Sequence, residues 1–267
     1  MNESVDRRIL GAFVCVDAIT GASVVNPMTV TSPQWRVKPN RSGIYVIFDG
    51  PGFRPLTTQF LPDASWPQAP TSFEVTLQDP SRRYLPRRAM VKAPLKVPAI
   101  ASSATASATN PAAVAALQDS TSVFDPQEVP LYPAPSAPVG PGWAVIHVSV
   151  TGASGAGLPW AVLQFTRGDT SAVTTCQADA SGEALLAVPG IPISAVQTSA
   201  TTTGGPVTST TIAVTVTAYF DPAIPTPAGW IPDTDAFNIS ASTVKSSSQS
   251  VQLGAGQELA MIFSLPV

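Results

Sequence analysis

The sequence predicts an all-β protein made of two sandwich-like domains joined by a linker rich in Pro, Ala and Ser. Three observations predict it. Short stretches of alternating apolar and polar residues recur along the chain, turn residues separate them, and a Pro-rich tract without Lys, Arg or His divides them into two groups. We therefore expect domains at 1–96 and 143–267 and a linker at 97–142, with a chain length that suits two domains.

The linker is defined by its composition. Proline lacks a backbone donor, and Ser and Ala supply little surface to bury, so most of this tract should be neither a central strand nor a long helix. Its one candidate helix is 111–118, where Asn110 could cap an Ala-rich run. The prolines of the tract are Pro98, Pro111, Pro126, Pro130, Pro133, Pro135, Pro138 and Pro141.

The first domain reads as six or seven short strands. Leu10, Ala12 and Val14 alternate with Phe13 and Cys15, and the run stops at a Thr-Gly turn. No segment before residue 97 shows the 3.6-residue period of a helix, so a sandwich accounts for this half. Strands are expected at 10–16, 24–31, 35–38, 44–48, 56–60 and 73–77.

The second domain shows the same alternation. Its clearest strand is 212–220, where apolar residues on one face alternate with Thr and Tyr on the other. At the end of the chain, a Gly-Ala-Gly-Gln turn between two apolar runs predicts a closing hairpin. Strands are expected at 144–150, 160–166, 183–188, 212–220, 251–253 and 259–265.

The two halves also repeat three turn signals in the same order. Thr-Gly-Ala-Ser at 20–23 matches 151–154, Asn-Arg-Ser-Gly at 40–43 matches Asp-Ala-Ser-Gly at 179–182, and Pro-Gly at 51–52 matches 189–190. Turn residues at equivalent places indicate that the two domains share a fold.

These turns, with the strands beside them, resemble the carboxypeptidase-regulatory or transthyretin-like β-sandwich, an Ig-like architecture. The residues that carry the resemblance are 16–21 with 40–46 and 148–152 with 179–186, about half of each domain. The resemblance implies rigid adhesive or spacer modules with no catalytic set to carry over. A weaker likeness, of architecture alone, is to structural parts of phage-tail-like contractile injection particles.

Charge and cysteine content suggest where and how the protein works. Charged residues make up only 12% of the chain, which favours a surface packed against partners, although a neutral Ser/Thr-rich surface is the alternative. Residues 1–140 hold 12 Lys and Arg against 10 Asp and Glu, and residues 141–267 hold 2 against 7. Cys15 and Cys176 lack metal or redox spacing, so we expect buried, reduced thiols. Without a recognisable signal peptide, we expect a cytoplasmic protein, or part of a particle assembled there and released.

A basic cluster follows the last strand of the first domain and forms its C-terminal arm at 82–96. Arginine suits pairing with carboxylates, so docking onto an acidic protein surface, including a second copy, is the favoured interpretation. A solvated face and nucleic-acid binding are the alternatives, the last the weakest. The residues expected to bind a partner are Arg82, Arg83, Tyr84, Arg87, Arg88 and Lys92.

Other candidate sites are sparse. His147, the only histidine, shares a strand face with Ser149, which indicates a surface residue and not a catalytic base. Asp233 and Asp235 supply too few ligands for calcium, so we expect no metal and no cofactor. Trp66 and Trp230 lie in Pro-rich loops and could contact a sugar.

The sequence therefore predicts a non-enzymatic adaptor subunit that holds other proteins in a larger assembly, with no membrane span. The alternative is a carbohydrate- or surface-binding module that uses the two loop tryptophans.

Overall fold

The computed structural model describes residues 9–50, 70–93, 125–192, 195–196, 207–208, 210–227 and 229–267. The described part of the chain is all-β, and its one helical element is a single 3-10 turn, η2 (Thr234–Ala236). The expected strand at 56–60, the candidate helix at 111–118 and Trp66 lie outside these residues. Residue contacts divide the chain into two units. Unit 1 is Met1–Val16, Ala22–Pro80 and Pro86–Pro130; unit 2 is Asp17–Gly21, Ser81–Leu85 and Leu131–Val267.

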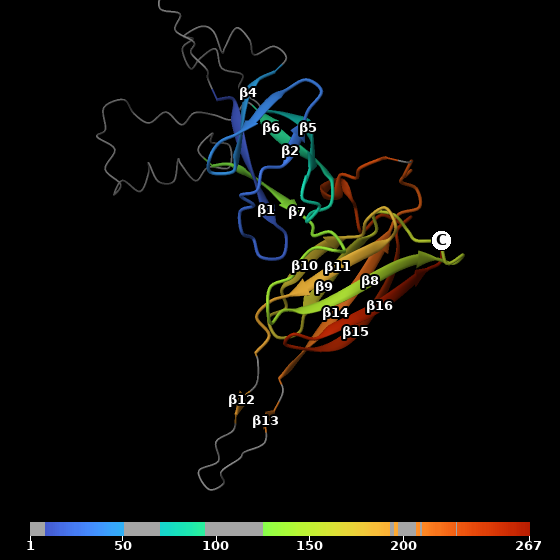
Figure 1. Cartoon of the computed structure of the whole chain (residues 1–267). Coiled ribbons are helices and arrows are strands. Elements are labelled where there is room, and N and C mark those ends of the chain that lie inside the picture. Colours follow the sequence, from blue (N-terminus) through green and yellow to red (C-terminus); the bar gives the residue numbers. More distant parts are fainter. Residues whose placement is uncertain are drawn as a thin grey trace, which may run out of the picture. The chain divides into compact units, whose positions relative to one another are not determined.

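Unit 1 contains a four-stranded and a three-stranded sheet (Figure 1). Their orders are β3-β4-β1-β7 and β2-β5-β6. Trp35, next to β3, stacks on Phe73 of β5 with ring centroids 4.3 Å apart, and this contact joins the two sheets. The strands are β1 (Gly11–Asp17), β2 (Thr29–Thr31), β3 (Arg36–Pro39), β4 (Ile44–Asp49), β5 (Thr71–Gln78), β6 (Arg87–Ala93) and β7 (Gln127–Leu131).

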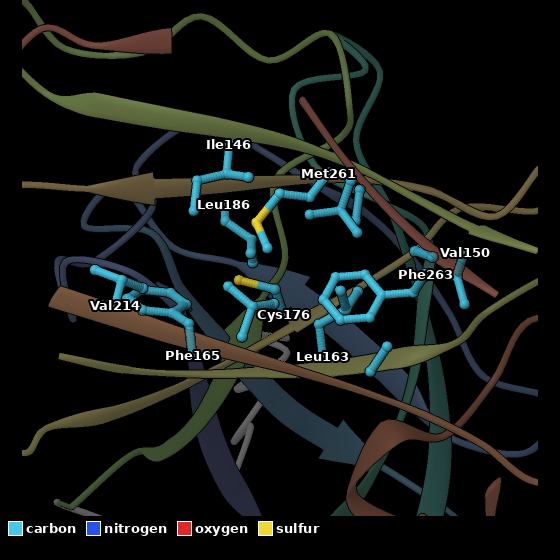
Figure 2. Close-up of a cluster of buried hydrophobic side chains, with 14 of the residues drawn as sticks. Ile146, Val150, Leu163, Phe165, Cys176, Leu186, Val214, Met261 and Phe263 are labelled. Atoms are coloured by element: carbon cyan, nitrogen blue, oxygen red, sulfur yellow. The ribbon is translucent and has the colours of Figure 1, made fainter. Parts of the chain in front are cut away.

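Unit 2 is a sandwich of sheets β10-β9-β14-β15 and β11-β8-β16. Alternate residues of both sheets point inward, so Ile146 and Leu186 of one meet Phe165 and Val214 of the other around Cys176 (Figure 2). A small two-stranded sheet, β12 (Ala195–Val196) with β13 (Val207–Thr208), pairs separately. The sandwich strands are β8 (Ala144–Gly152), β9 (Val162–Arg167), β10 (Val173–Gln177), β11 (Glu183–Val188), β14 (Thr211–Phe220), β15 (Lys245–Gly254) and β16 (Glu258–Leu265).

The two units repeat one topology. In unit 1 the neighbours β4-β1-β7 match β11-β8-β16 in unit 2, and β2-β5-β6 match β9-β14-β15. The third strand differs, because β3 pairs with β4 in one sheet whereas β10 pairs with β9 in the other. The shared fold expected from the repeated turns is thus present, with one strand moved between sheets.

The structure differs from the expected spacer at 97–142. Residues 127–131 form β7, at the edge of a unit 1 sheet, and residues 131–142 belong to unit 2. An edge strand tolerates Pro130 because one of its sides needs no backbone donor. The basic arm also contains a strand, β6, which pairs with β5 from Leu77–Arg87 to Thr71–Ala93.

The expected closing hairpin is wrong. β15 pairs with β14, whereas β16 runs parallel to β8 in the opposite sheet. The turn between them therefore carries the chain across the sandwich, and the side chain of Gln257 supports it by accepting the Gly254 N–H at 2.9 Å. Alternation predicts each strand but not its neighbour, because both pairings bury the same residues.

Candidate binding surfaces

Arg82 and Arg83 lie on an exposed turn before β6. The turn is held in place on both sides, since the Leu85 N–H donates to the Tyr132 carbonyl at 2.8 Å and the Ala134 N–H donates to the Arg83 carbonyl at 2.9 Å. Arg82 has a φ of 57°, in the left-handed region. The turn therefore presents two cationic side chains from an ordered backbone.

Tyr84 is anchored beside this turn by an acidic partner. Its hydroxyl donates to Asp17 Oδ2 at 2.9 Å, and Asp17 Oδ1 accepts the N–H groups of Ile19 and Thr20. Tyr84, Asp17 and Arg83 line a hollow of about 350 Å³, partly open to solvent. Tyr84 thus supports the arginine turn through its own hydrogen bond.

Arg87 was expected to bind a partner, and the structure corrects this prediction. Its side chain is fully buried, at 0% exposure, and its Nη1 donates to the Pro130 carbonyl of β7. A buried guanidinium cannot reach a partner's carboxylate. Arg87 instead joins β6 to β7 inside unit 1.

The other two basic residues of β6 differ in their exposure. Arg88 is half-buried and its Nη1 lies 3.3 Å from Glu74 Oε2. Lys92 is exposed, and its backbone exchanges two 2.9 Å hydrogen bonds with the Gln127 amide. The contact division places Arg82, Arg83 and Tyr84 in unit 2, and Arg87, Arg88 and Lys92 in unit 1.

His147 lies on the outer face of its sheet, as expected. Its Nε2 is 2.9 Å from Glu258 Oε1, and the two side chains are 42% and 72% exposed. Ser149, two residues on, donates to Glu183 and not to the imidazole. Within the described ranges, no group of three or more His, Cys, Asp and Glu side chains could hold a metal ion.

Trp230 lies beside a hollow on one end of the unit 2 sandwich. The loop after β14 folds over the sheet there, and the hollow has about 360 Å³ of space, part of it open to solvent. Trp160 and Gln177 also line it, and the sequence analysis selected neither as a candidate site residue. The alternation of Cys176 and Ala178 with Gln177 was the available signal, but β10 was too short to stand out.

The outer face of the sheet β10-β9-β14-β15 carries no charged side chain over three register rows. Thr215 pairs with Ser250 and Thr217 with Ser248, and each pair of hydroxyls is hydrogen bonded, at 2.9 and 2.8 Å. The rows are Val173, Thr166, Thr215 and Ser250; Thr175, Gln164, Thr217 and Ser248; Gln177, Val162, Tyr219 and Ser246. Val162 and Gln177 of the third row are buried and line the hollow beside Trp230, so we call the other ten residues the neutral face.

Both cysteines are free and buried, which confirms the expectation of reduced thiols. Burial raises the pKa of Cys15 and that of Cys176 to about 12. Neither thiol is suited to nucleophilic chemistry near neutral pH.

Comparison of the chain with protein-family models and with curated proteins finds no match. Among the described residues, no helix has the length and apolarity to cross a bilayer.

Proposed function

We propose that this chain is a non-enzymatic adaptor subunit whose two β-sandwich units dock onto other proteins in a larger assembly. A phage-tail-like particle is the kind of assembly that we propose, with modules of the transthyretin-like class as its building blocks. The proposed partners are proteins with acidic surfaces. A second copy of the same chain is one candidate partner.

The observation that carries this proposal is the exposed Arg82–Arg83 turn. The other cations of unit 2 are Arg167 and Lys245. Arginine binds carboxylates through bidentate hydrogen bonds. An ordered backbone also reduces the conformational entropy that is lost on docking. The turn therefore suits a carboxylate-bearing protein surface.

The neutral face supports the same proposal. Contact with a partner removes water from charged groups at a cost, and interface centres are depleted in charge. A face with hydroxyl, amide and small apolar groups can be covered without that cost. Its hydroxyl pairs each share one hydrogen bond already, as at Thr217 and Ser248.

Charge reversal at the turn tests the proposal. The full-length chain, tagged and purified from cells that encode it naturally, should co-purify with partners in fixed stoichiometry or elute as a symmetric oligomer. The Arg82→Glu/Arg83→Glu variant should lose at least about ten-fold in affinity for them, because like charges now face each other.

The matched control is Lys38→Glu/Arg41→Glu, which makes the same charge change at exposed residues of unit 1. This control should keep its partners. A monomer without stoichiometric partners, or an equal loss in both variants, would contradict the proposal.

A further inference from the structure

The hollow beside Trp230 has the lining of a ligand site. Its wall is mainly apolar and includes two tryptophans, Trp160 and Trp230, and two phenylalanines, Phe220 and Phe237. All of its lining residues belong to unit 2. Small-molecule sites are likewise concave and mostly apolar with a few polar groups.

Gln177 places a hydrogen-bond donor in this wall. Its side chain is only 1% exposed, and its Oε1 accepts the Thr234 hydroxyl at 3.1 Å. Its Nε2 is buried and has no hydrogen-bond partner among the residues that the structure describes. A buried amide N–H normally has a partner, because leaving it unpaired is costly. A ligand oxygen in the hollow would supply the missing acceptor.

Two carboxylates place acceptors along the same hollow. Asp221 Oδ1 accepts the Ala223 N–H at 3.0 Å, and Asp233 Oδ1 accepts the Asp235 N–H at 3.2 Å, so turn hydrogen bonds hold both side chains. Both residues are half-buried and line the hollow. A carboxylate has lone pairs left after one such bond and can accept further hydrogen bonds.

The backbone at Trp160 is a further sign of a site. This residue has a φ of 62°, which a bulky side chain rarely adopts, and its N–H donates to the Asp179 carbonyl at 3.0 Å. Strained positions persist only where the surroundings hold them, and they cluster at binding sites. Trp160 itself lines the hollow.

We propose that this hollow binds a saccharide ring. A sugar ring has an apolar C–H face that packs on indole, and hydroxyls that both donate and accept hydrogen bonds. The aromatic side chains of the wall, the Gln177 amide donor and the carboxylates of Asp221 and Asp233 match these three features. A Pro-rich peptide would use the wall and the amide but has few donors for the two carboxylates.

The test uses the full chain on an array of oligosaccharides printed beside an array of Pro-rich peptides. Saccharides that score are then titrated in solution by calorimetry. Trp230→Ala should weaken binding by about ten-fold or more through loss of stacking. The double variant Gln177→Met/Thr234→Val should weaken it as much through loss of the donor.

The double variant separates binding from folding. It removes both partners of a buried hydrogen bond and the unpaired N–H with them, so the melting temperature should stay the same or rise. Gln164→Leu is the matched control, a glutamine of the same sheet face that does not line the hollow, and it should bind as the unchanged chain does.

Several results would overturn the saccharide proposal. They are binding to peptides alone, no binding to either array, or saccharide affinity that survives in both Trp230→Ala and the double variant. Arg82 and Arg83 lie outside the hollow, so these outcomes are independent of the docking test.

Discussion

Asn40 and Asp179 make the same turn in the two units. Asn40 Oδ1 accepts the N–H groups of Ser42 and Ile44, both at 2.9 Å. Asp179 Oδ1 accepts those of Ser181 and Glu183, at 2.7 and 3.0 Å. Each turn ends at a glycine of positive φ, and each leads into the strand that pairs with the first strand of its unit. The repeat detected in the sequence is therefore a repeat of hydrogen bonds.

The two turn glycines should differ in their tolerance of alanine. Gly43 and Gly182 have φ values of 77° and 83°, so alanine costs about 1–2 kcal/mol of backbone strain at either. A Cβ on Gly182 would lie 2.6 Å from the Val150 carbonyl oxygen, whereas on Gly43 its nearest neighbour would be 3.4 Å away. Calorimetric unfolding should show a larger loss for Gly182→Ala, and equal losses would contradict the packing argument.

Arg87 should matter for stability and not for docking. Truncation to alanine leaves a cavity and removes a donor from the Pro130 carbonyl, so Arg87→Ala should lower the free energy of unfolding of unit 1 by about 2–5 kcal/mol. Arg88→Ala, the half-buried neighbour paired with Glu74, should cost about 1 kcal/mol or less. Urea titrations of both variants measure the difference, and a neutral Arg87→Ala would refute the buried role.

Stability should fall at alkaline pH because of the two thiols. Burial raises the pKa of Cys15 and that of Cys176 to about 12, whereas an unfolded thiol titrates near 9. Above pH 9 the unfolded chain releases these protons and the folded chain keeps them. Each thiol therefore lowers the free energy of unfolding by up to about 1.4 kcal/mol per pH unit until its folded pKa is reached.

Urea midpoints measured at pH 8 and pH 10 check this slope. A Cys15→Ala/Cys176→Ala variant is the control, and it should lose less stability between the two values. Tyr45 adds to the same trend in both chains, because burial also raises its pKa. An identical slope with and without the thiols would contradict the prediction.

A charge in the middle of the neutral face should disturb assembly and leave the fold intact. Thr217 lies in the middle row, on the central strand β14. If a partner covers this face, Thr217→Lys places a cation in the contact and should reduce partner recovery by about ten-fold or more. Thr217→Val, which keeps the size, is the comparison, and light scattering with partner recovery measures both. Unchanged assembly of the lysine variant would remove this face from the proposal.

Strand positions could be predicted from the sequence because alternation is local. The expected run at 212–220 corresponds to β14 at Thr211–Phe220, and the run at 183–188 has the bounds of β11. Strands without clear alternation were missed, as at 87–93 and 127–131. The strand at 87–93 was missed because it begins with Arg87. In a sequence, a buried cation is read as a surface residue and hides the alternation.

The binding groups were less predictable than the strands. Arg82, Arg83 and Trp230 could be selected by residue type alone, but the unpaired Nε2 of Gln177 depends on a loop that begins more than forty residues later. Contacts between segments far apart leave no local signal. The exposure of each arginine likewise follows from packing and not from charge.

By itself the sequence determined the all-β class, the repeated turns and the free thiols, since these depend on alternation, on glycine and Asx chemistry and on apolar surroundings. The tertiary structure decided which strands pair, that β15 and β16 lie in opposite sheets, and that Arg87 is buried while Arg82 is exposed. The physical reason is that strand pairing and burial depend on the whole set of contacts, and several arrangements satisfy one pattern of apolar residues.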